Sequence, residues 1–113
     1  MTIYFYLPVY KASYDLLLEI FKVIKDFNRE YKYTLGENIK KETMEMVTNI
    51  YRANSSFSKK PYIQKAREEI ETIRIFFRLT RDLRQVGFKK FVDINEKIEN
   101  VSKQLSAWER SQK

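Results

Sequence analysis

Four arginines recur at helical spacing in the second half of the chain: Arg67, Arg74, Arg78 and Arg81. At about 100° per residue they fall within about 60° of one another on a helix and form a stripe about 21 Å long. A guanidinium group binds phosphate oxygens or carboxylates through paired hydrogen bonds, and it also stacks on bases. The spacing therefore predicts a surface for the backbone of RNA or DNA.

Positive charge is concentrated in the same segment. Residues 59–84 hold eight basic and four acidic side chains, which is +4 of the formal net charge of +7. A field of this sign raises the local concentration of polyanions. The alternative is pairing within the helix, three or four residues apart: Arg67 with Glu71, Glu71 with Arg74, and Arg78 with Asp82. Two carboxylates cannot neutralise every arginine, so we expect some positive charge to face solvent or a partner.

The residue types that most often carry catalysis are missing. The chain has no histidine and no cysteine, which removes the commonest general base, thiolate nucleophiles and most zinc ligands. Its two glycines stand alone, so there is no glycine-rich phosphate loop. Three pairs of carboxylates lie beside Lys or Arg at helical spacing and are interpreted as a solvated, ion-paired face: Asp26/Glu30, Glu42/Glu45 and Glu68/Glu69. We predict a protein that is not an enzyme and has no metal site and no cofactor.

Apolar periodicity predicts four helices joined by short loops. They run from Pro8 to about Phe27 or Glu30, from the Thr34 cap to about Ala53, from between Ser58 and Pro61 to Val86, and from just after Gly87 to about Trp108. With only two glycines and two prolines, few sites suit the tight turns of a sheet. The pattern predicts an all-α, antiparallel up-down-up-down four-helix bundle, with residues 1–113 forming one domain.

Three local signals place the helix ends and the core. Thr34 is followed three residues later by Glu37, which predicts a capping box at the start of the second helix. Gly87 predicts the stop of the third helix. The fourth helix carries an a/d seam for shallow-angle packing, made of Phe91, Ile94, Ile98, Val101, Leu105 and Trp108.

The junction between the first two predicted helices, residues 27–39, reads FNREYKYTLGENI. It resembles a family of small four-helix-bundle proteins encoded in 23S rRNA intervening sequences, which includes the accessory variability determinant (Avd) of diversity-generating retroelements. Shorter stretches extend the resemblance over nearly the whole chain: residues 14–17 (YDLL), 51–54 (YRAN), 78–83 (RLTRDL) and 105–108 (LSAW).

Similarity to the accessory variability determinant implies a homopentamer whose basic surface binds a reverse transcriptase and its template RNA. Such a protein supports mutagenic cDNA synthesis without catalysing it. Charge and resemblance together assign nucleic-acid or polymerase contact to the basic residues Lys65, Arg67, Arg74, Arg78, Arg81 and Arg84. Two alternatives remain open: an intervening-sequence protein that binds structured RNA, and a purely structural interaction protein.

Self-association is expected for two reasons. The first and third helices are apolar over a wider arc than a monomeric bundle needs, and residues 3–7 (IYFYL) add further apolar surface. These patterns favour a closed homo-oligomer but do not give the number of subunits. No apolar run approaches the roughly 20 residues that span a bilayer, and the N-terminus lacks the features of a signal peptide. We expect a cytoplasmic protein with no membrane partner.

Overall fold

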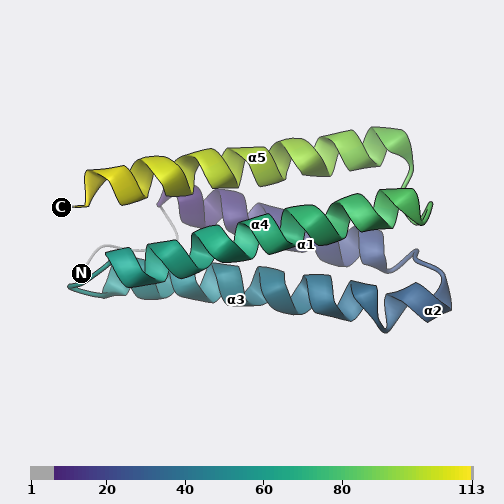
Figure 1. Cartoon of the computed structure of the whole chain (residues 1–113), viewed down its shortest axis with the longest axis horizontal. Coiled ribbons are helices and arrows are strands. Elements are labelled where there is room, and N and C mark those ends of the chain that lie inside the picture. The colour runs from purple at the N-terminus through teal and green to yellow at the C-terminus, as the bar shows by residue number, and fades with distance from the viewer. Residues whose placement is uncertain (1–6, 113) are drawn as a thin grey trace.

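The structure is a computed structural model that describes residues 7–112. It contains four long helices, α1 (Pro8–Ile24), α3 (Leu35–Ser55), α4 (Lys60–Asp82) and α5 (Phe88–Ser111), and a single turn of helix, α2 (Arg29–Lys32) (Figure 1). The described part of the chain has no strand, which confirms the all-α class. Residues 3–6 of the predicted apolar segment lie outside the described residues.

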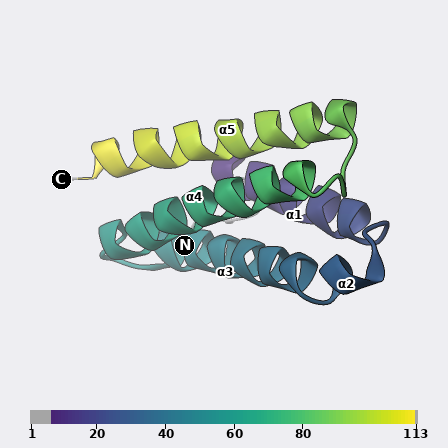
Figure 2. The ribbon, with the colours of Figure 1, turned by 45° about the vertical axis from the view of Figure 1, so that its right-hand side comes forward.

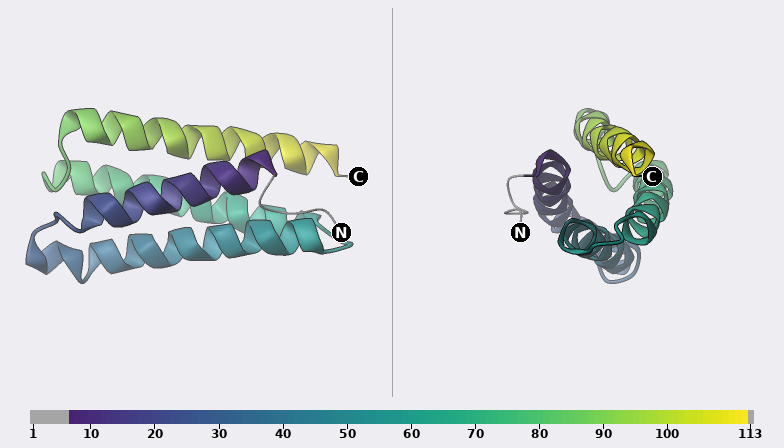
Figure 3. Two further views of the ribbon diagram at one scale, coloured as in Figure 1. Left: turned by 180° about the vertical axis from the view of Figure 1, so that it is seen from behind. Right: turned by 90° about the vertical axis from the view of Figure 1, so that its left-hand side faces the viewer.

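The long helices form an antiparallel bundle in which α1 and α4 each pack against both α3 and α5 (Figures 1 and 3). The short α1–α2–α3 connection and the α4–α5 turn lie at one end of the bundle, and the α3–α4 loop lies at the other (Figures 1 and 2). The chain therefore runs up, down, up and down, as predicted. Two connections that are far apart in sequence meet at one end.

The core consists of the apolar stripes that the sequence pattern indicates. Ile24, Ile50, Ile73 and Ile98, one from each long helix, are fully buried. Burying such a side chain contributes about 1.5–3 kcal/mol, so packing between stripes holds the helices together. The predicted seam of α5 lies in the core or packs against it throughout.

The first helix ends earlier than predicted. It stops at Ile24 rather than at Phe27 or Glu30, and the chain turns so that Phe27 is buried against the core. The backbone N–H of Asn28 then donates a 2.7 Å hydrogen bond to the side-chain oxygen of Gln85 in the α4–α5 turn. This long-range bond ties the two connections at that end together.

The α3–α4 loop begins later than predicted, because α3 continues two residues past Ala53 to Ser55. The Lys59 ammonium donates to the carbonyl oxygens of Ala53, Asn54 and Ser56 at 3.0–3.1 Å. A lysine satisfies otherwise unpaired carbonyls at a helix C-terminus. This lysine therefore stabilises the fold, and its three N–H donors are used within the chain.

The predicted capping box is wrong. Thr34 precedes α3, but its side chain makes no capping bond to the helix. Its hydroxyl donates to the carbonyl oxygen of Glu30 at 2.7 Å, and Glu37 instead pairs with Lys40 at 3.3 Å. The reason is α2, whose single turn brings the Glu30 carbonyl within reach of the threonine.

The predicted stop at Gly87 is also wrong. Helix α4 ends at Asp82, and Gly87 serves as the N-cap residue of α5. The stop is a Schellman motif, in which Gln85 N–H donates to Thr80 O at 2.8 Å and Arg84 N–H donates to Arg81 O at 2.9 Å. Arg84 occupies the left-handed position of this motif with φ 59°, a conformation that usually selects glycine.

Candidate nucleic-acid interface

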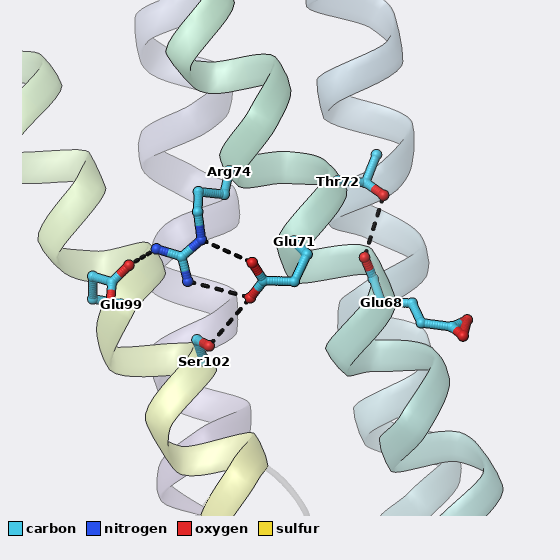
Figure 4. Close-up of polar contacts among 6 residues, drawn as sticks. All are labelled: Glu68, Glu71, Thr72, Arg74, Glu99 and Ser102. Atoms are coloured by element: carbon cyan, nitrogen blue, oxygen red, sulfur yellow. Dashed lines mark hydrogen bonds and ion pairs between the residues drawn. The ribbon is translucent and has the colours of Figure 1, made fainter.

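The arginine stripe of α4 faces the groove between α4 and α5. Arg67 binds Glu109 of α5, and Gln64 donates to the same carboxylate at 2.9 Å. Arg74 pairs with Glu71 on its own helix at 3.0 Å and with Glu99 of α5 (Figure 4). These two arginines therefore link neighbouring helices, and carboxylates neutralise both of them.

Ser102 of α5 joins the Arg74 network by donating to the Glu71 carboxylate at 3.5 Å (Figure 4). The intrahelical pairs expected for Arg74 with Glu71 and for Arg78 with Asp82 are present. Arg67, which was expected to pair with Glu71, reaches across to α5 instead. Part of the arginine stripe is therefore used in contacts with α5, and periodicity within one helix does not predict such contacts.

The arginines of the stripe that lie near the α4–α5 turn are more accessible to a partner. The side chain of Arg78 is 66% exposed, and its bond to Asp82 is long at 3.5 Å. Arg81 is exposed and forms no ion pair with the other described residues. Its guanidinium instead lies 5.2 Å from the ring centroids of both Phe88 and Phe91. Cation–π contact fixes the group in place and leaves its donors unused.

The two remaining predicted residues lie apart from each other. Arg84 is exposed within the α4–α5 turn. Lys65 is exposed on the opposite side of α4, where it lines a groove with Glu69 and residues of α3. The structure therefore brings Arg78, Arg81 and Arg84 together and separates Lys65 from them.

Other cations join this group. Lys89 and Lys90, both exposed, follow directly after the turn. Lys90 also lines a groove with Lys22 of α1 and with Lys25, the residue directly after α1. The Glu19 carboxylate lies 3.6 Å from the Nζ atoms of both Lys90 and Lys22. We define the basic end as five residues, Arg78, Arg81, Arg84, Lys89 and Lys90. Asp82 and Glu19 are the carboxylates paired with them.

Aromatic rings accompany this charge. Phe77 is buried and stacks on Phe91 with centroids 5.4 Å apart, and Arg81 lies over Phe91. Phe88 is 67% exposed, so its ring is accessible beside the arginine. An exposed ring next to a guanidinium can stack an unpaired base while the cation contacts phosphate.

Two features of the basic end were not identified from the sequence. Lys89 and Lys90 fall just outside the segment counted as basic, although two consecutive lysines after Gly87 are visible in the sequence. Gln85, which ties the two connections together, gives no signal in a single sequence.

The carboxylates also differ from expectation. Glu42 and Glu45 of α3 come together with Glu69 of α4, and none of the three forms an ion pair with the other described residues. The predicted ion-paired face is therefore wrong for these residues. Burial raises the pKa of Glu69 and of Glu42, and nearby carboxylates raise both further.

The fold and its surface define a small, basic, all-α helical-bundle protein. The chain belongs to the bAvd-like family, whose family model matches residues 8–112. This match confirms the resemblance found at the helix junction. Comparison with curated proteins finds no match. Within residues 7–112, no helix is both long and apolar enough to cross a membrane.

Proposed function

We propose that this protein is a non-catalytic accessory protein of a diversity-generating retroelement. In this role it is a cytoplasmic, oligomeric scaffold that binds the reverse transcriptase and its template RNA and supports mutagenic cDNA synthesis. The observation that carries the proposal is the basic end of a bAvd-like bundle, where exposed Arg81 lies beside exposed Phe88.

The composition of the basic end supports RNA as a ligand. Three arginines and two lysines there can contact successive phosphates, and the Phe88 ring offers a stacking surface for an unpaired base. The Asn28 to Gln85 hydrogen bond holds the α4–α5 turn against the rest of the bundle. A surface held in this way loses less entropy on binding than a flexible loop does.

Two separate apolar patches support a closed homo-oligomer. One lies on α1, where Tyr14, Leu18 and Phe21 are 40–44% exposed. The other lies on α4, where Ile75 and Leu79 are 66% and 42% exposed. Contact between two different patches of identical subunits is heterologous, and such contacts form a ring when the rotation between neighbouring subunits closes. The expected number of five subunits comes from the resemblance.

RNA binding is tested by fluorescence anisotropy with a labelled single-stranded RNA. The double variant Arg81→Glu/Arg84→Glu should lose binding, and the slope of log affinity against log salt should flatten by about 0.7 per lost phosphate contact. The matched control is Lys103→Glu/Arg110→Glu, which makes the same change in charge at exposed positions elsewhere on α5. If wild type binds no RNA at low salt, RNA binding is excluded.

The partner and the assembly are tested by purification of the tagged protein from its own host. We expect a reverse transcriptase and its template RNA to copurify, and light scattering to give five subunits. A reverse transcriptase gene and a pair of variable repeats should lie beside this gene. Copurification with ribosomal RNA alone would favour the intervening-sequence alternative, and absence of any RNA would favour a purely structural role.

A further inference from the structure

The loop between α3 and α4, residues 56–59, carries the most exposed large apolar side chain in the described part of the chain. The relative exposure of Phe57 is 105%, whereas Phe88 and Ile75, the next most exposed, reach 67% and 66%. The loop lies at the end of the bundle opposite the basic end (Figure 1). Both faces of the Phe57 ring are therefore open to a partner that stacks on them.

The backbone that carries this ring is held in place. The Lys59 ammonium binds three carbonyl oxygens, those of Ala53, Asn54 and Ser56. The Ser56 N–H also donates to the Ala53 carbonyl at 3.3 Å. The chain on both sides of Phe57 is therefore tied to the end of α3. A ring on an ordered loop loses less conformational entropy on binding than a ring on a flexible loop does.

The sequence around the loop carries charge of one sign. Residues 46–67 contain no aspartate and no glutamate, although 15 of the 113 residues of the chain are acidic. The same stretch holds five basic residues: Arg52, Lys59, Lys60, Lys65 and Arg67. A surface of this sign attracts polyanions.

Three of these five cations are available to a partner. Lys59 is used within the loop, and Arg67 binds Glu109 of α5. The other three are exposed and form no ion pair with the residues that the structure describes: Arg52, Lys60 and Lys65. The Phe57 ring thus stands among cations that are free to contact an anion.

Arg52 and Lys65 line the same groove between α3 and α4. Arg52 lies in the last turn of α3 and Lys65 in the second turn of α4, so both are close to the loop along the chain. Glu45 and Glu69 line the groove further from the loop, and Glu69 bonds Asn49 rather than Lys65. Lys65 was predicted to contact nucleic acid, and the structure places it here instead of at the basic end.

We propose that the α3–α4 loop is a second contact for a single-stranded nucleic acid. An unpaired base stacks on the Phe57 ring, and phosphates on either side of it meet the three available cations. These cations favour a nucleic acid over the apolar pocket of a protein, because such a pocket would bury charges beside the ring without partners. The inference rests on the proposed function only for the choice of RNA over DNA.

The test compares substitutions of Phe57 by fluorescence anisotropy with a labelled single-stranded RNA. Phe57→Ala should weaken binding about 5- to 140-fold, the range for loss of one base stacked on an aromatic ring. Phe57→Leu is the matched control for apolar area, because it keeps an apolar side chain without an aromatic face. It should bind as weakly as Phe57→Ala, and Phe57→Trp should bind at least as tightly as wild type. The side chain is fully exposed, so these changes do not threaten folding.

A local readout separates this contact from the basic end. In a Trp108→Phe background, Phe57→Trp places the single tryptophan of the chain in the loop. Its fluorescence should be quenched by RNA, because a base stacks directly on the indole. If Arg81→Glu/Arg84→Glu binds RNA as wild type does while Phe57→Ala does not, the loop contact stands and the proposed basic end fails.

Three results would overturn the proposal. Equal RNA affinity of wild type and Phe57→Ala, with no quenching of the loop tryptophan, would remove the loop contact and leave the basic end intact. Phe57→Leu binding as tightly as wild type would show that stacking is not involved. Loss of a copurifying protein from Phe57→Ala, with RNA affinity unchanged, would assign the ring to a protein partner.

Discussion

The guanidinium of Arg74 in α4 pairs with the carboxylate of Glu99 in α5 while also holding Glu71 of its own helix (Figure 4). One arginine thus joins two carboxylates across the α4–α5 groove, and its side chain is 30% exposed. Arg81, two turns further along the same stripe, has aromatic rather than acidic neighbours. Arginines that look equivalent in the sequence therefore have different roles.

This difference predicts opposite effects for two substitutions. Arg74→Gln should lower the free energy of unfolding by about 0.5–1 kcal/mol, because a partly exposed ion-pair network contributes that much, and should change RNA affinity little. Arg81→Gln should weaken RNA binding more than it changes stability. Urea unfolding and anisotropy measure the two quantities, and an equal loss of RNA affinity in both variants would contradict this division.

Arg84 allows stability and binding to be separated at one position. With φ 59° it occupies a conformation that costs a residue with a side chain about 1–2 kcal/mol. Arg84→Gly should raise the free energy of unfolding by about 0.5–1 kcal/mol, after allowance for the greater freedom of glycine in the unfolded chain. The variant should nevertheless bind RNA more weakly. Arg84→Ala, the control, loses the same charge without relieving the strain and should not gain stability.

Gly36, in the first turn of α3, lies close against Ile24 at the end of α1. A Cβ atom there would lie 2.7 Å from Cγ2 of Ile24 and 3.2 Å from the carbonyl oxygen of Tyr31. Because Ile24 is fully buried and cannot move freely, Gly36→Ala should lower the free energy of unfolding by about 1–3 kcal/mol. Gly87→Ala is the matched control, since a Cβ there meets nothing within 4 Å and its φ is −72°. Similar effects of the two substitutions in urea unfolding would refute this explanation.

Glu109 gives the bundle a defined dependence on pH. The hydrogen bond from Arg67, assisted by that from Gln64, lowers the pKa of this carboxyl below its ordinary value of 4.5. The lowered pKa stabilises the folded state above about pH 4.5, and this stabilisation is lost as the pH falls through the folded-state pKa. In urea unfolding between pH 7 and pH 3, Glu109→Gln should lose less stability than wild type. Parallel curves for the two proteins would show that the Arg67 contact does not form in solution.

Much of the architecture follows from periodicity. The α5 seam was predicted residue by residue, because a helix fixes the angle between its own side chains and a wide apolar stripe has to be buried. The helix ends were predicted less well. Thr34 and Gly87 are typical end signals, yet Thr34 bonds back to Glu30, and Arg84 rather than Gly87 takes the left-handed position. In both cases the residue type is typical of a helix end, but the conformation of the neighbouring backbone decides which residue takes that role.

The sequence alone determined the class of this protein: a basic, all-α bundle of four long helices, in a family recognisable from its helix junction. Only the tertiary structure decided which arginines remain available, since Arg67 and Arg74 meet acids of α5 and Arg81 does not. It also joined Glu69 to Glu42 and Glu45. The physical reason is that spacing along one helix fixes angles within that helix, whereas contacts between helices depend on their rotation and register in the packed bundle.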